Sequence, residues 1–124
     1  MPKNWGFLSM AEIGIIEKLH AKHGNPTHEH DFKIEIVLEG ELDSKPYVAG
    51  IDWNEIIPFV RNILSKIENK DLKDILCKEE NFKSSGCEAL SVFLIRKIKE
   101  KYPVKFIRIW ETETRYSTVY AEEI

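Results

Sequence analysis

The sequence has no long apolar run and no excess of basic residues, and each absence excludes a class of function. Its apolar runs fall far short of the roughly 20 residues that a membrane-spanning helix needs, so we expect no membrane contact. Lys and Arg number 18 against 21 Asp and Glu, interspersed along the chain, and the net charge of −3 provides no footprint for nucleic acid. Residues 1–6 do not resemble the start of a secretory signal, which predicts a cytoplasmic protein.

Cysteine is scarce, and linkers and internal repeats are absent. Cys77 and Cys87 lie outside any CxxC motif, and in a reducing compartment we expect both to be free thiols. A chain of 124 residues with 43% hydrophobic and 31% charged residues has the size and composition of one globular domain. We therefore predict a single domain over residues 1–124.

Alternating apolar and polar residues predict the strands. Residues 31–38 show the clearest alternation, and His28 and His30 share the parity of its apolar side. The segment 5–16 is ambiguous, and a strand over residues 7–11 is favoured because two helices would otherwise lack a sheet to cover. Residues 104–124 are rich in β-forming residues, with a turn predicted near residues 113–116.

Two apolar stripes at helical spacing predict the helices. Asp52 and Glu55 form a capping-box pattern at the start of the first helix, in which Pro58 predicts a bend or a later start. The second helix is predicted to begin near Ser85 and to run to about Lys101. The order of elements predicts an α+β fold: a four-stranded antiparallel sheet with both helices on one face, in ββααββ order. Its open edges favour an oligomer.

All four histidines gather in one short stretch: His20, His23, His28 and His30. Imidazole is a common zinc ligand, and residues at i and i+2 of a strand point the same way, so His28 and His30 are candidate metal ligands. Histidines at a strand edge with no metal explain the spacing as well. The sequence pattern alone leaves both interpretations open.

Glu111 and Thr112 end the most apolar strand of the C-terminal region. A carboxylate in that place can accept two hydrogen bonds from the N–H and amino groups along one edge of a heterocycle. A solvated glutamate near a turn is the alternative. We assign no catalytic role to Cys77 or Cys87, because neither has a histidine beside it in the sequence.

Four stretches, in order, resemble the 6-pyruvoyltetrahydropterin synthase and 6-carboxytetrahydropterin synthase family. "HEHDFKIEIVLEGEL" is similar to its His-Gly-His-Asn-Tyr strand, and "YVAGIDWNEI" resembles its Gly-Met-Val-Ile-Asp-Phe segment. "SSGCEALSVFLIRKI" resembles the opening of its second helix, and "VKFIRIWETETRYSTVY" resembles its closing strands with their Glu-Thr. The resemblance implies the tunnelling fold, in which subunits join through sheet edges into barrels. These barrels usually assemble into hexamers that are dimers of trimers.

The resemblance also implies a pterin pocket and a zinc ion. His28 and His30 would be two zinc ligands, Glu111 with Thr112 would bind the pterin ring, and Glu88 would line the pocket. The family's first zinc histidine has no counterpart here, where "FLSMAEI" stands. Glu12 is then the nearest candidate for the third ligand, and His20 and His23 are the alternatives.

The family's catalytic residues are also replaced. His23 stands at roughly the place of the catalytic cysteine, and Glu68 and Asn69 stand where the family has Asp and His. Proton transfer would then fall to His23, Glu68 or a bound water. The resemblance implies an enzyme acting on 7,8-dihydroneopterin triphosphate; the alternative is a non-catalytic homologue that binds a pterin or purine. The lysines considered for triphosphate binding are Lys18, Lys22 and Lys33.

Overall fold

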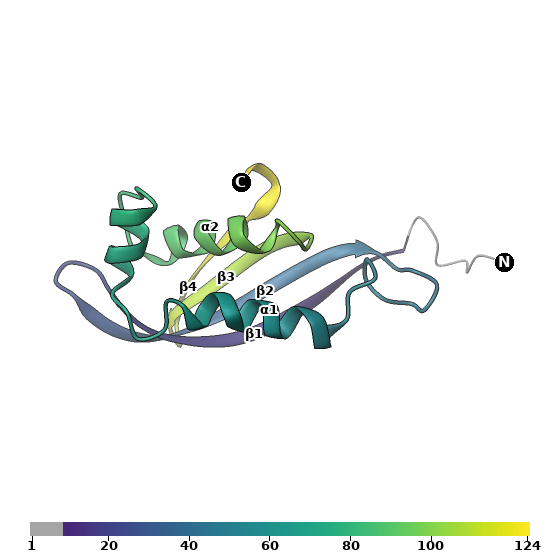
Figure 1. The fold of residues 1–124 in the computed structure, drawn as a ribbon, viewed down its shortest axis with the longest axis horizontal. Helices are drawn as coiled ribbons and strands as arrows, with labels where there is room; N and C mark the ends of the chain where they lie inside the picture. Colours follow the sequence, from purple (N-terminus) through teal and green to yellow (C-terminus); the bar gives the residue numbers. More distant parts are fainter. Residues whose placement is uncertain (1–8) are drawn as a thin grey trace.

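Two long strands form the first half of the sheet in the computed structural model, which describes residues 9–124. β1 (Met10–His23) and β2 (His28–Glu41) pair antiparallel along their whole lengths, from Met10 opposite Glu41 to His23 opposite His28. β3 (Val104–Thr112) pairs with β2, and β4 (Arg115–Tyr120) pairs with β3. The sheet is therefore antiparallel in the order β1-β2-β3-β4 (Figure 1).

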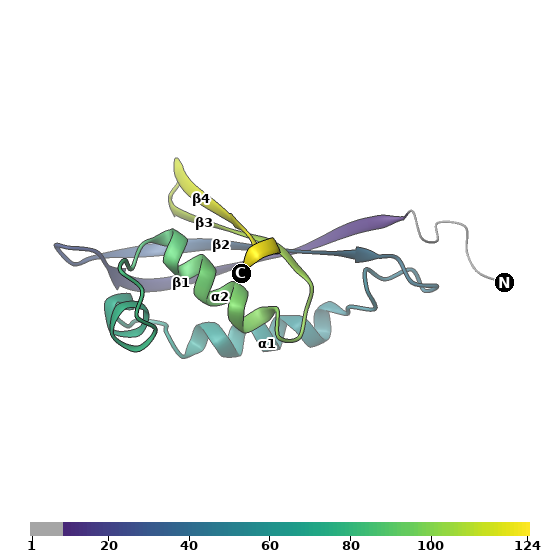
Figure 2. The same cartoon turned by 90° about the horizontal axis from the view of Figure 1, so that it is seen from above.

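The alternation in β2 divides the sheet into two chemically different faces. Its apolar side chains are fully buried under the helices: Phe32, Ile34, Ile36 and Leu38. The intervening residues point to the other side of the sheet, because successive strand residues face opposite ways. We call the side under the helices the helix face and the opposite side the open face. Figure 2 shows both helices on the same side of the sheet.

Helix α1 (Trp53–Ser65) begins where the sequence predicts, with Asp52 as its N-cap. The Asp52 side chain accepts the backbone N–H of Asn54 at 2.9 Å. The helix starts at Trp53 and continues through Pro58, so the later start is excluded. Its buried stripe packs on the sheet and consists of Ile56, Val60 and Leu64.

Helix α2 (Cys87–Ile98) is buried on most of its sides, and its bounds correct the prediction. Gly86, rather than Ser85, precedes the helix, and the helix ends before Lys101. Ser85 instead uses its hydroxyl to accept the backbone N–H of Gly24, at 3.3 Å. This contact ties the entry of α2 to the hairpin between β1 and β2.

Two short helices were not predicted: the π-helical segment η1 (Lys73–Glu79) and the 3-10 helix η2 (Ala121–Glu123). None of the helices in residues 9–124 is long and apolar enough to cross a membrane. Cys77 and Cys87 are both free.

The predicted α+β fold is confirmed, and the first strand is the main difference. β1 extends to His23, well beyond the predicted residues 7–11, of which the first two lie outside the described residues. Glu17 interrupts the apolar alternation of this strand, which made the pattern ambiguous. In the structure Glu17 lies on the helix face, 3.2 Å from the Arg61 guanidinium of α1.

Candidate functional site

Three histidines and one glutamate converge at the hairpin end of the sheet. His23 ends β1, His28 and His30 begin β2, and Glu111 lies near the end of β3. One nitrogen or oxygen of each residue lies within 4.8 Å of the corresponding atoms of the others. Glu111 Oε1 is 2.9 Å from His30 Nε2, 3.4 Å from His23 Nε2 and 3.7 Å from His28 Nε2. We call these four residues the histidine–glutamate cluster.

Local backbone geometry brings these side chains together. The hairpin register places His23 directly opposite His28, and His30 follows on the same face. Gly24 has a φ of +85°, and a Cβ at this position would lie 2.5 Å from the His28 ring. On β3, the pairing shifts register between Trp110 and Thr112, which places Glu111 at an irregularity of the kind that redirects a side chain.

Backbone carbonyls fix the orientation of two of the rings. His23 Nδ1 lies 2.9 Å from the Ser85 carbonyl oxygen, and His28 Nδ1 lies 2.9 Å from that of Pro26. A carbonyl oxygen only accepts hydrogen bonds, so each Nδ1 is a donor, and in the neutral ring with this tautomer Nε2 has a lone pair for a metal. Burial lowers the pKa of His30, which favours the neutral form that binds metals.

The cluster fits a zinc ion. Among the described residues, the buried Nε2 atoms of His23 and His30 make no hydrogen bond, even though His30 Nε2 lies close to Glu111. Ligand atoms at about 2.0–2.1 Å from one tetrahedral ion lie roughly 3.4 Å from one another. The three distances from Glu111 Oε1 scatter around that value. Three nitrogens and one carboxylate oxygen are a donor set that zinc accepts.

The structure places Glu12, the residue predicted as the third ligand, far from the cluster. Glu12 pairs with Lys105 and lies opposite Glu39, nine positions along β1 from the strand pair Ala21 and His30. At about 3.3 Å per strand residue, that places it roughly 30 Å from the cluster. His20 lies on the open face, where its Nδ1 is 2.7 Å from Asp31. His23, predicted as a proton-transfer residue or an alternative ligand, is the third histidine of the cluster.

The other predicted residues divide between the two faces. Glu68 lies apart from the cluster, because its carboxylate accepts the backbone N–H of His20 at 3.1 Å. Glu88 and Glu111 line the same pocket, as predicted. Thr112 instead lines a pocket on the open face, together with Lys18 and Lys33.

The pocket beside the cluster is small and polar. Its volume is about 160 Å³, and its walls come from the start of α2, from Glu111 and from β4. The buried Ser117 hydroxyl in this pocket makes no hydrogen bond with any described residue. Burial, together with the charges of Glu111 and Glu88, raises the pKa of the Cys87 thiol to about 12. The protonated thiol of Cys87 is therefore favoured at neutral pH. We call this cavity the cluster pocket.

Sequence reasoning missed the residues that support the cluster. Ser85 and Pro26 act through backbone carbonyls, which carry no side-chain signature. Gly24 was detectable in principle, since a glycine before Asn-Pro in a hairpin often has positive φ. Arg115 and Ser117 of β4 also line the cluster pocket.

Comparisons with solved structures show the fold. The 6-pyruvoyl tetrahydropterin synthase of Caenorhabditis elegans superimposes with a TM-score of 0.77 at 15% identity, covering 90% of this chain and 95% of that one. The Plasmodium vivax enzyme gives 0.70 at 14% identity, covering 89% and 96%. An uncharacterised protein from Wolinella succinogenes gives 0.67 at 14% identity, covering 91% and 99%.

The sequence comparisons identify the family. No curated protein sequence matches the chain. The family model for 6-pyruvoyl tetrahydropterin synthase, however, matches residues 11–122, which is nearly the whole chain. The chain belongs to the 6-pyruvoyl tetrahydropterin synthase family.

Proposed function

We propose that this protein binds a pterin of the 7,8-dihydroneopterin triphosphate type and acts on it as a carbon–oxygen lyase. The observation that carries the proposal is the histidine–glutamate cluster beside a polar pocket, in a chain of this family. The reaction class is that of the family, and the residues of this chain determine how it would proceed.

His23, His28 and His30 would hold a zinc ion, with Glu111 as the neighbouring carboxylate. When bound, the ion supplies a Lewis acid that polarises the oxygens of the pterin side chain. The carbonyls of Ser85 and Pro26 hold the His23 and His28 rings in place and fix their tautomers. Loss of a group that hydrogen-bonds to a metal ligand commonly weakens metal affinity by about 10–100-fold.

The pterin ring would enter the cluster pocket. Glu111 and Glu88 offer carboxylate oxygens to the N–H and amino groups of the ring edge, and the Ser117 hydroxyl has no partner among the described residues. Because Glu111 also lies next to the histidines, it would hold the ring close to the ion. The role proposed for Thr112 is withdrawn, because this residue lines the pocket on the open face.

A homo-oligomer would complete the pocket. Its volume of about 160 Å³ is below the roughly 300–1,000 Å³ of ordinary ligand pockets, so one chain supplies only part of the walls. β4 pairs on one side within the described residues, and residues 69–71 hydrogen-bond to the outer edge of β1 only near His20 and Lys22, so the rest of both sheet edges is left for neighbouring subunits. We propose a hexamer, a dimer of trimers, working in the cytoplasm, where reducing conditions keep Cys77 and Cys87 free.

Proton transfer would fall to a carboxylate. Two solved Plasmodium vivax relatives are variants of a glutamate described as a catalytic residue, so a carboxylate takes a catalytic part in that protein. In this chain Glu88 lines the cluster pocket and Glu68 does not, which favours Glu88. His23 moves from proton transfer to metal binding.

A non-catalytic pterin- or purine-binding homologue is the second candidate. Its support is that Asn69 stands where the family has a histidine and His23 where it has the catalytic cysteine, while Glu111 is kept. Asn does not transfer protons near neutral pH.

One assay separates the two candidates. Zinc-loaded protein is incubated with 7,8-dihydroneopterin triphosphate, and pterins and free triphosphate are separated by chromatography. We expect a new pterin and inorganic triphosphate in equal amounts, both lost with a chelator and in Glu111→Gln. Saturable pterin binding without product would establish the binding homologue. The absence of pterin binding would overturn both proposals.

A further inference from the structure

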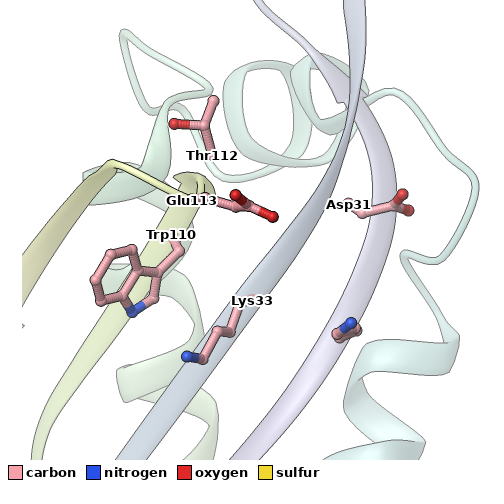
Figure 3. A pocket seen from close by; sticks show the side chains of 6 residues that line it. Asp31, Lys33, Trp110, Thr112 and Glu113 are labelled. Atoms are coloured by element: carbon pink, nitrogen blue, oxygen red, sulfur yellow. The ribbon is translucent and has the colours of Figure 1, made fainter.

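A second pocket lies on the open face of the sheet, on the side away from the histidine–glutamate cluster. Its volume is about 520 Å³, and its lining consists of Lys18, Asp31, Lys33, Trp110, Thr112 and Glu113. Figure 3 shows side chains from β2, β3 and the β3–β4 turn gathered around it. The pocket is separate from the cluster because neighbouring residues of β2 alternate: His30 faces the helices, whereas Asp31 and Lys33 face away. We call it the lysine pocket.

The two lysines of this pocket stand directly opposite each other. Lys18 on β1 and Lys33 on β2 are register partners, and Lys33 is also the register partner of Trp110 on β3. Like charges directly opposite on adjacent strands destabilise a sheet. Within residues 9–124 neither lysine forms an ion pair. By contrast Lys105, on the same face, pairs with both Glu12 and Glu39.

Two acids near the lysines are engaged elsewhere. Asp31 lies 2.7 Å from His20, and this hydrogen bond raises the pKa of His20. The Glu35 carboxylate accepts the indole N–H of Trp110. Glu113 in the β3–β4 turn is the remaining acid at the rim. Lys18 and Lys33 therefore line the pocket with no ion-pair partner among the described residues, and Asp31, Thr112 and Glu113 supply hydrogen-bond acceptors in its lining.

Shape and charge together indicate the class of ligand. The Lys33 ammonium lies over the Trp110 ring, 5.2 Å from its centre, so a cation and an aromatic ring adjoin in this pocket. A volume of about 520 Å³ falls within the roughly 300–1,000 Å³ of metabolite pockets and leaves room beyond a single inorganic anion. Two neighbouring lysines suit a phosphate group, Trp110 suits a planar body, and Glu113 suits hydroxyl or amino donors.

We propose that the lysine pocket binds a small organic phosphate with a planar ring, independently of the metal and the pterin. The phosphate contacts Lys18 and Lys33, and the ring lies toward Trp110 and the β3–β4 turn. These lysines were considered above for the triphosphate of a pterin. Their position on the open face assigns them instead to a separate site.

Calorimetric titration of the full chain with adenosine 5′-monophosphate tests the proposal, because this probe lacks the aminopyrimidinone edge of a pterin. Adenosine and inorganic phosphate, each alone, serve as partial ligands. We expect saturable binding of the monophosphate that weakens with added salt, and binding of each partial ligand at least about tenfold weaker. Equal binding of inorganic phosphate would reduce the pocket to a simple anion site and overturn the proposal.

Matched variants locate the binding. Lys18→Gln and Lys33→Gln should each weaken binding about tenfold, the value of one charge-assisted contact. Lys105→Gln, on the same face and with the same change of net charge, should leave it unchanged. His30→Ala should also leave it unchanged, so a failure of the proposed metal site would not affect this result. No saturable binding, or equal losses in Lys18→Gln and Lys105→Gln, would overturn the proposal.

Discussion

The two faces of strand β2 carry opposite chemistry within a few residues. On the helix face, His28 and His30 turn their Nε2 atoms toward Glu111, an arrangement suited to a cation. On the open face, Lys33 stands opposite Lys18 with no acid paired to either among the described residues, an arrangement suited to an anion. Both groups belong to the same hairpin, so the backbone that positions one also positions the other.

The difference between the faces lies in what surrounds each group. The helix face is covered, and His23 is buried to 5% exposure between the sheet and the entry of α2. The open face bears no helix among the described elements, and its charged groups meet solvent. Burial makes the histidine–glutamate cluster sensitive to small displacements, whereas the lysine pocket should respond mainly to charge and salt.

The largest expected effect comes from removing a ligand on the helix face. His30→Ala should weaken zinc binding by at least about 100-fold. Removing a metal ligand should reduce zinc affinity more than removing a group that hydrogen-bonds to a ligand. The measurement is competition for zinc against a chromophoric chelator. His20→Ala, which removes a histidine from the open face, and Glu12→Gln should keep the affinity of the wild type. Equal losses in His30→Ala and His20→Ala would place the metal elsewhere.

A smaller effect should follow from moving one ring without removing it. Gly24→Ala places a Cβ where the His28 ring lies and should weaken zinc binding by about 10–100-fold. Gly50→Ala is the matched control, since Gly50 has a similar positive φ of 71° and its Cβ would approach only Asp43, at 3.7 Å. Both variants should lose about 1 kcal/mol of stability from backbone strain. Zinc affinity should fall only in Gly24→Ala. A similar fall in both variants would show that backbone strain, and not displacement of the His28 ring, is the cause.

The smallest effect concerns pH and the open face. The hydrogen bond to Asp31 raises the pKa of His20 in the folded protein, so this pair stabilises the fold while His20 is protonated. The contribution is fully present below the unfolded pKa of about 6.5 and is lost as pH rises through the folded pKa. His20→Gln should therefore narrow the gap in unfolding free energy between acidic and neutral pH. Urea unfolding at several pH values measures this difference. An unchanged difference in His20→Gln would contradict a stabilising His20–Asp31 hydrogen bond.

The fold was largely predictable because its signals are local. The alternation of residues 31–38 fixed the face of β2, and the apolar stripes located both helices. The end of α2 and the length of β1 were harder to predict from the sequence. Glu17 breaks the alternation of β1 and is satisfied only by Arg61 on a distant helix.

The site was predictable only in part, because it depends on contacts between strands. His28 and His30 follow from strand parity alone. His23 joins them because the hairpin register places it opposite His28, and no spacing in the sequence determines that register. Glu12 was selected by its distance along the chain, but an antiparallel strand carries it to the far end of the sheet.

X-ray absorption at the zinc edge of the metal-loaded protein tests the central claim most directly. We predict one zinc per chain with three imidazole nitrogens at about 2.0–2.1 Å. His23→Ala should lose one nitrogen from this shell, and Glu12→Gln should leave it intact. A shell with fewer than three imidazoles in the wild type, or one that changes in Glu12→Gln, would contradict the account.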